Sequence, residues 1–114
     1  MNGGDIMRIT KEQAIEIANE AMEVAGYDIM SYAGYYTIWQ DDNDPENNYS
    51  VAINKEADEN GDDRHFAIYV SVPTDESWWE YTSSLDVNEL AYELMTIAIN
   101  VEIAEEKKAG YIWK

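Results

Sequence analysis

One long helix, predicted over residues 87–109, constrains the fold of this chain more than any other segment. Asp86 stands where an N-cap is expected, Glu89 follows it as in a capping box, and Gly110 can end the helix. Apolar residues recur at intervals of three and four in two stripes, which comprise Val87, Leu90, Leu94, Ala98 and Val101, and Tyr92, Met95, Ile99 and Ile103. A helix about 33 Å long with two such stripes must be covered on more than one side.

A second helix is predicted over residues 11–25, before the first strand. Thr10 and Gln13 form a capping-box pattern at its start, and Gly26 can end it. Its apolar face is rich in alanine, which permits close packing against a sheet or another helix. Its opposite face carries a row of carboxylates at a spacing of about 6 Å, made up of Glu12, Glu16, Glu20 and Glu23.

Three strands are predicted between the helices, over residues 29–40, 49–54 and 65–72. Aromatic and β-branched residues indicate the first strand, in which Gly34 indicates a bulge or a close packing point. The other two strands alternate apolar and polar residues, and Asn60-Gly61 between them is a hairpin signal. The acidic stretch 41–48 is predicted as a turn, and residues 74–85 as a loop with at most a short extended piece.

This order predicts an α+β domain: a helix, a three-stranded antiparallel β-meander and a long C-terminal helix packed on the sheet. Both helices are expected on one face of the sheet. Residues 1–114 are expected to form this single acidic domain, with residues 1–8 as a disordered extension. The second apolar stripe of the long helix can be covered by the first helix, by the Trp78-Trp79 loop or by a second copy of the chain, as in a homodimer.

The charge of the chain restricts its partners. The 24 acidic residues outnumber the seven basic ones, which gives a formal net charge of −17. Such a surface repels nucleic acid and anionic membranes and attracts basic proteins from a distance. The chain has no cysteine, no apolar signal segment at its start and no apolar run of the roughly 20 residues that a membrane helix needs, so we expect a cytoplasmic protein.

The sequence offers little support for catalysis, and we predict no enzyme activity, no cofactor and no metal. His65 is the single histidine, and neither a Gly-x-Ser-x-Gly motif nor a glycine-rich phosphate loop is present. Residues 56–61 match the first half of an EF-hand calcium loop, but the twelfth position, where a bidentate glutamate belongs, is Ala67. An acidic hairpin turn explains this stretch better.

Acidic residues form three clusters along the sequence: Asp41, Asp42, Asp44 and Glu46; Glu56, Asp58, Glu59, Asp62 and Asp63; and Asp75, Glu76 and Glu80. A meander would bring the first and third clusters to one edge of the sheet. That edge would lie beside Trp39, Trp78 and Trp79, so aromatic anchors would be ringed by carboxylates, as in an interface for a basic protein groove. The alternative is that the tryptophans belong to the core and the acids only keep the protein soluble. The candidate partner-binding residues are Asp41, Asp42, Asp44, Glu46, Asp75, Glu76, Trp78, Trp79 and Glu80, with Glu12, Glu16 and Glu20 as an extension.

In size, charge and helix–sheet–helix order the chain resembles the small acidic inhibitors of phages and mobile elements, among them anti-CRISPR and anti-restriction proteins. The resemblance rests on composition and architecture, and no site residue is carried over from it. It implies an inhibitor in the host cytosol that binds a basic nucleic-acid enzyme by phosphate mimicry or by occlusion of its DNA channel. The alternatives are an interaction or immunity-type module without DNA mimicry, and an acidic enzyme or calcium module.

Overall fold

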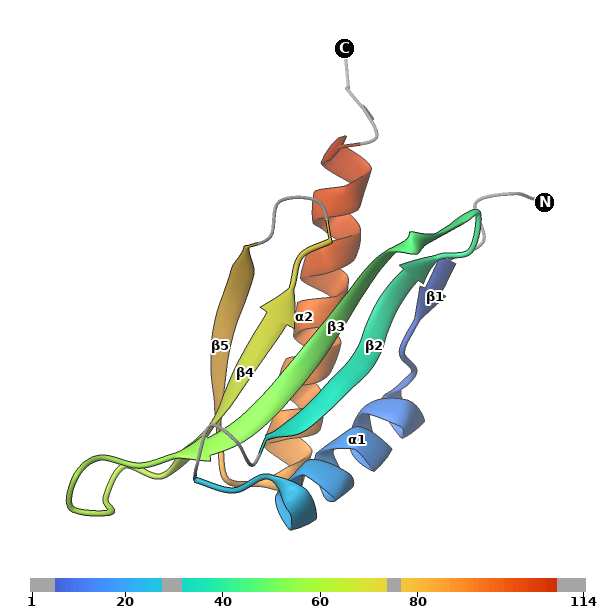
Figure 1. Ribbon diagram of the computed structural model, residues 1–114. Coiled ribbons are helices and arrows are strands. Elements are labelled where there is room, and N and C mark those ends of the chain that lie inside the picture. Colours follow the sequence, from blue (N-terminus) through green and yellow to red (C-terminus); the bar gives the residue numbers. More distant parts are fainter. Residues whose placement is uncertain (1–5, 28–31, 74–76, 109–114) are drawn as a thin grey trace.

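The computed structural model describes residues 6–27, 32–73 and 77–108, which form a five-stranded antiparallel sheet with two helices on one face (Figure 1). The strands lie in the order β1-β2-β3-β4-β5 across the sheet. Along the chain the elements are β1 (Ile6–Arg8), α1 (Lys11–Val24), β2 (Ala33–Asp41), β3 (Asp44–Glu56), β4 (His65–Ser71), β5 (Trp78–Ser84) and α2 (Val87–Lys108).

The structure confirms the α+β class, the position of both helices on one face and the packing of the C-terminal helix on the sheet. The prediction of three strands is wrong, because β1 and β5 flank the three that were expected. Residues 6–8 pair with β2 and therefore do not belong to a disordered extension, whereas residues 1–5 lie outside the described part. Most of the expected loop 74–85 is strand β5, and most of the expected turn 41–48 is the start of β3.

Helix α1 begins as its sequence predicts. The Thr10 hydroxyl accepts a hydrogen bond from the Gln13 backbone, and the Gln13 side chain accepts one from the Thr10 backbone. The three alanines of its inner face, Ala14, Ala18 and Ala21, are fully buried. At the other end the Lys55 ammonium donates to the Met22 carbonyl at 2.7 Å, which places a positive charge where the helix dipole is negative.

Helix α2 lies along the sheet with its first apolar stripe buried from Leu90 onward and Val87 partly buried. The Asp86 carboxylate accepts a hydrogen bond from the Glu89 backbone at 3.0 Å, as the capping pattern predicts. The second apolar stripe of α2 is only partly covered. Helix α1 packs beside α2, but Tyr92 is 73 % exposed and Ile99 and Ile103 are also exposed. Neither helix in the described residues is long and apolar enough to cross a membrane.

The sheet has one covered face and one open face. Alternate residues of β3 and β4 are fully buried against the helices, namely Tyr49, Val51, Ile53, Phe66, Ile68 and Val70. The residues between them point to the other face, which no helix of the described part covers (Figure 1). The bulge predicted at Gly34 is confirmed, because the β2–β3 register shifts between Gly34 and Tyr36, and Tyr35 has a φ of 64°.

Strand β5 forms one edge of the sheet. The Val72 backbone donates to the Ser77 carbonyl at 3.2 Å, which fixes the phase of the ladder between β4 and β5. Val72 and Ser77 thus form a hydrogen-bonded pair, and such pairs alternate with non-hydrogen-bonded pairs along an antiparallel ladder. Trp78, Glu80 and Thr82 fall in the non-hydrogen-bonded pairs, so their backbone N–H and C=O groups point away from β4. Within the described residues no further strand pairs with this edge.

Candidate binding surface

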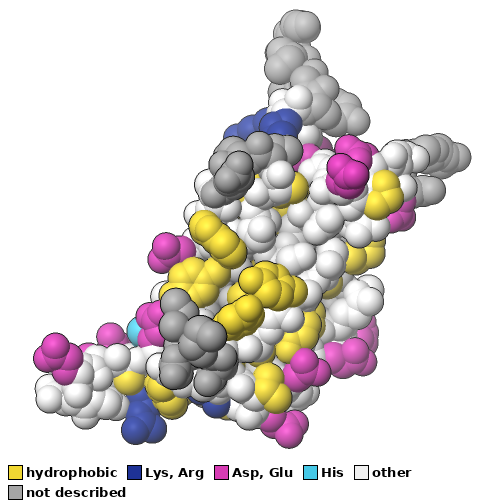
Figure 2. Space-filling view, viewed as in Figure 1, with side chains coloured by type: hydrophobic (Ala, Val, Ile, Leu, Met, Phe, Trp, Pro, Cys, Tyr) yellow, Lys and Arg dark blue, Asp and Glu magenta, His cyan; other side chains and the backbone are white. Residues whose placement is uncertain are grey.

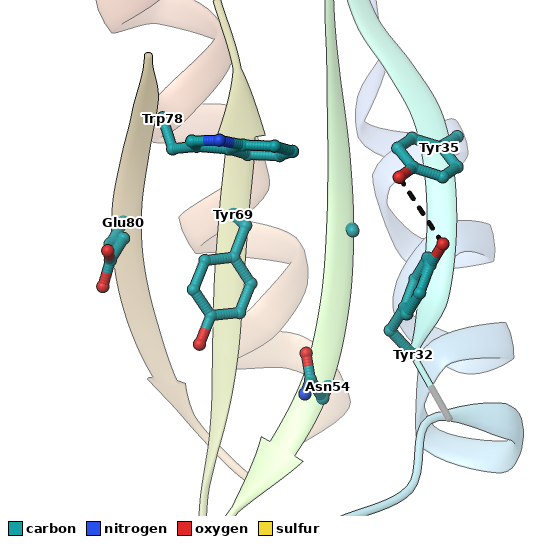
Figure 3. Close-up of a pocket in the computed structure, with 7 residues that line it drawn as sticks. Tyr32, Tyr35, Asn54, Tyr69, Trp78 and Glu80 are labelled. Atoms are coloured by element: carbon teal, nitrogen blue, oxygen red, sulfur yellow. Dashed lines mark hydrogen bonds between the residues drawn. The ribbon is translucent and has the colours of Figure 1, made fainter. Parts of the chain in front are cut away.

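The strand register places three rows of side chains across the open face. The rows are Thr37, Ser50, Ser71 and Trp78; Gly34, Ala52, Tyr69 and Glu80; and Asn54, Ala67 and Thr82. Four small side chains lie in the middle of the sheet, namely Ser50, Ala52, Ala67 and Ser71, whereas the large side chains of Tyr69 and Trp78 stand on β4 and at the β5 edge. The result is a groove of about 350 Å³ on the sheet surface (Figure 3), lined by Tyr32, Tyr35, Ala52, Asn54, Tyr69, Trp78 and Glu80. We call it the open-face groove.

The β2 side of the groove is a pair of tyrosines. The rings of Tyr32 and Tyr35 meet edge to face with centroids 5.6 Å apart, and their hydroxyls are 3.5 Å apart. A Cβ on Gly34 would lie 2.4 Å from the Tyr32 ring, so the ring can take this position only because residue 34 is glycine. Tyr32 is 40 % exposed and Tyr35 is 61 % exposed, so both present ring surface to solvent.

The opposite side of the groove consists of Tyr69 on β4 and Trp78 on β5. Trp78 is 54 % exposed, and its indole lies across β4 above Tyr69 (Figure 3). The Tyr69 hydroxyl donates to the Glu56 carboxylate at 2.7 Å. This hydrogen bond, with partial burial and the charges of Glu56 and Glu80, raises the pKa of Tyr69 to about 12. This side of the groove is therefore both aromatic and negatively charged.

The floor of the groove holds a polar side chain. Asn54 is only 5 % exposed and lies between Tyr69 and Tyr32 (Figure 3). Its side-chain amide has no hydrogen-bond partner in the part of the chain that the structure describes. Its amide atoms are not among the buried unpaired side-chain atoms of the described residues, so they face the groove, where water or a polar group of a ligand can hydrogen-bond to them.

The adjacent tryptophans, expected to anchor the same surface, point to opposite faces because strand residues alternate. Trp78 belongs to the open-face groove together with the predicted residue Glu80. Trp79 faces the helices, and its ring centroid lies 5.6 Å from that of Tyr49. Trp39, expected beside the acidic edge, is buried at 2 % exposure, and its indole N–H has no acceptor among the described residues.

The expected acidic edge lies at the other end of the sheet from the β3–β4 hairpin. Asp41, Asp44 and Glu46 surround a depression of about 480 Å³ together with Pro73, Glu105 and Lys108. Pro73, just after β4, thus lies beside the acidic residues of the β2–β3 turn, together with Lys108, but Glu80 of the expected merged edge lines the open-face groove instead. Asp42 is exposed in the turn between β2 and β3, and Asp75 and Glu76 lie outside the described residues.

The predicted carboxylate row on α1 is exposed to solvent. Glu12 and Glu16 are exposed, and Glu20 accepts a hydrogen bond from the Tyr36 hydroxyl. Burial of the phenol, followed by this hydrogen bond and the charge of Glu20, raises the pKa of Tyr36. The row therefore borders β2 without lining the open-face groove.

Most carboxylates have no positive partner. Among the described residues, ion pairs with a basic side chain involve only Glu56, Glu102 and Glu105. Figure 2 shows carboxylates around the periphery of the open face and apolar side chains near its centre. The acidic side chains of the described part form no group of three or more that could hold a metal ion, and Asp58 of the calcium-like stretch instead accepts hydrogen bonds from the Asn60 and Asp62 backbones.

Sequence reasoning missed Tyr32, Tyr35, Asn54 and Tyr69. The alternation of β3 and β4 assigned Asn54 and Tyr69 to the polar face, but it did not show that small residues beside them would leave a groove. A useful signal was the small residues on this face of both strands, Ser50 and Ala52 in β3 and, on either side of Tyr69, Ala67 and Ser71 in β4. Comparison of the chain with protein-family models, curated proteins and solved structures finds no match.

Proposed function

We propose that this chain is a non-catalytic binding protein that uses the open face of its sheet to occupy a basic surface of another protein. The observation that carries the proposal is the exposed aromatic groove surrounded by carboxylates that lack basic partners (Figure 2). Aromatic residues at the centre of an interface supply most of the binding energy, whereas rim charges steer the encounter and select the partner.

The density of charge favours a nucleic-acid enzyme as the partner. A net charge of −17 over a longest dimension of 52 Å is about one negative charge per 3 Å. DNA carries one phosphate per roughly 3.4 Å of each strand, so a basic channel that binds this polyanion would also attract a chain of this charge. In this proposal the protein inhibits the enzyme by phosphate mimicry or by occlusion of its DNA channel.

A second candidate is an interaction or immunity-type module whose partner has no role in nucleic-acid binding. The groove itself favours this alternative, because imitation of a phosphate backbone needs carboxylates and no aromatic cleft. Both candidates place Trp78 at the interface, and they differ in whether DNA competes for the partner.

The test is retention of bacterial proteins on the immobilised chain at low salt, followed by elution with duplex DNA and then with salt. The lysate should contain restriction and CRISPR nucleases. Inhibition of a nucleic-acid enzyme predicts that DNA releases such an enzyme and that Trp78→Ala reduces its retention. Tyr92→Ala, which removes an exposed aromatic side chain on α2, serves as the matched control.

Two results decide between the candidates. Partners that salt elutes and DNA does not would favour the interaction module. Retention that neither salt nor Trp78→Ala reduces would refute both, because the charges and the groove would then take no part in binding. Charge reversal of Asp42 and Asp44 should also weaken retention, and unchanged retention would remove the β2–β3 hairpin from the interface.

A further inference from the structure

We infer that the open-face groove is the binding site for an arginine side chain of the partner, an inference that rests on the proposed binding function. The groove is small: about 350 Å³ is near the lower end of the range for ligand pockets and suits one or two side chains. Its occupant must therefore be a side chain that protrudes from the partner.

The walls of the groove suit a flat cation. Tyr32 and Tyr35 stand on one side, and Tyr69 and Trp78 on the other, with exposed ring surface on both sides (Figure 3). A guanidinium group stacks on aromatic faces and is attracted by their π electrons, with tryptophan the strongest partner. Because the group is planar and weakly hydrated, it can enter such a slot at a lower desolvation cost than an ammonium group.

The polar groups of the groove are matched to hydrogen-bond donors. The Asn54 amide at the floor of the groove offers a carbonyl oxygen that accepts no hydrogen bond from the described residues and faces the groove. Glu80 offers a carboxylate at the rim, and no basic side chain of the described part pairs with it. A guanidinium group carries five N–H donors in a plane, enough to reach both acceptors while its faces stack on the rings.

Other occupants leave part of the groove unsatisfied. An apolar side chain would bury Asn54 and Glu80 without hydrogen bonds, which costs affinity. A nucleic-acid base would bring phosphates toward a chain with a net charge of −17. A lysine would supply charge but neither the planar stacking surface nor the fixed fork of donors.

The experiment is an NMR titration of the full chain with the peptide acetyl-Gly-Arg-Gly-amide at constant low ionic strength. Two matched peptides carry lysine or citrulline, the neutral isostere of arginine, in place of the arginine. We expect the arginine peptide to shift the Trp78 indole N–H and Asn54 side-chain signals. We also expect it to bind about tenfold more tightly than the citrulline peptide, as the loss of a charge-assisted contact implies.

Variants separate the groove from general attraction to an acidic surface. Trp78→Ala should weaken arginine-peptide binding about tenfold, and Tyr92→Ala should leave it unchanged. Asn54→Ser shortens the floor side chain and should also weaken binding, with circular dichroism to establish that the variant is folded. Equal binding of the arginine and citrulline peptides, or binding that Trp78→Ala does not change, would overturn the inference.

The inference and the proposed function fail in different ways. If the chain retains a partner that salt or DNA displaces but the arginine peptide does not shift the groove signals, the arginine site is wrong and the binding function stands. If retention is insensitive to both salt and Trp78→Ala, the binding function is wrong, whatever the peptides do.

Discussion

The contact between Gly34 and Tyr32 makes a prediction that is independent of any partner. Substitution Gly34→Ala places a Cβ 2.4 and 2.6 Å from two atoms of the Tyr32 ring, so the ring must move. The backbone can accept the alanine, because Gly61 is the one glycine with a positive φ among the described residues. The substitution should therefore displace the β2 wall of the groove while the sheet remains intact.

The magnitude follows from the burial of Tyr32. The side chain is 40 % exposed, so folding removes about 60 % of a surface of roughly 200 Å², or about 120 Å². At about 25 cal/mol per Å² this is a ceiling of about 3 kcal/mol, of which a displaced ring keeps part. Alanine is favoured over glycine in a strand by about 0.5–1 kcal/mol. The net loss of stability should be about 1–2 kcal/mol, which lowers Tm by about 5–10 °C.

A double-mutant cycle with Tyr32→Ala tests the cause. Thermal unfolding of the four proteins should show that Gly34→Ala destabilises the parent chain. In the Tyr32→Ala background the new methyl group has room, so Gly34→Ala should instead stabilise the protein by about 0.5 kcal/mol. If Gly34→Ala is equally costly in both backgrounds, the clash with the Tyr32 ring is not its cause and the described position of that ring is wrong.

Three further predictions concern stability. Trp79→Ala should cost about 2–3 kcal/mol in chemical denaturation because Trp79 packs on the core, whereas the exposed Trp78→Ala should cost less than about 1 kcal/mol; equal costs would contradict the assignment of the two indoles to opposite faces. Burial opposes ionisation of Glu105, but hydrogen bonds from Asn47, Tyr49 and Lys108 outweigh it and lower the pKa of Glu105, so its carboxylate stabilises the fold above its unfolded pKa and loses this effect as pH falls through the folded value. The stability difference between the parent and Glu105→Gln should thus be about 1–2 kcal/mol at pH 7 and should shrink below about pH 4.5. Because the pKa of Tyr69 is raised to about 12, its contribution is complete below pH 10 and is lost as pH rises from about 10 to 12, and Tyr69→Phe should remove that pH dependence from denaturation curves.

The helices could be predicted from sequence because their signals are local. Thr10 with Gln13 and Asp86 with Glu89 fix the two helix starts through contacts three residues apart, and the apolar stripe of α2 repeats over its whole length. The edge strands have no comparable signal. Strand β1 has only three residues. Strand β5 begins with two adjacent tryptophans, so its sequence does not show the apolar–polar alternation of a strand, which becomes clear only from its pairing with β4.

The groove could not be predicted because it depends on register between strands that are distant in sequence. Tyr69 faces Ala52 and Glu80 only because β3, β4 and β5 pair in one particular alignment. Tyr35 reaches the groove through a bulge at positive φ, which Gly34 suggested without giving its direction. The acidic clusters were visible in the sequence, but the separation of Trp78 from Trp79 was not. Side chains of neighbouring strand residues point to opposite faces, and two adjacent tryptophans do not reveal which of them faces the core.

The uncovered edge of β5 also bears on how this protein behaves when its charges are lost. The outward backbone groups of Trp78, Glu80 and Thr82 form a template on which another chain could extend the sheet. At neutral pH every copy carries 17 excess negative charges, so two such edges repel each other before they can pair. Acidification removes that repulsion, and any copy that is still folded presents the same edge. The high charge then also prevents two copies from pairing through their β5 edges. We expect self-assembly into filaments once the carboxylates are neutralised.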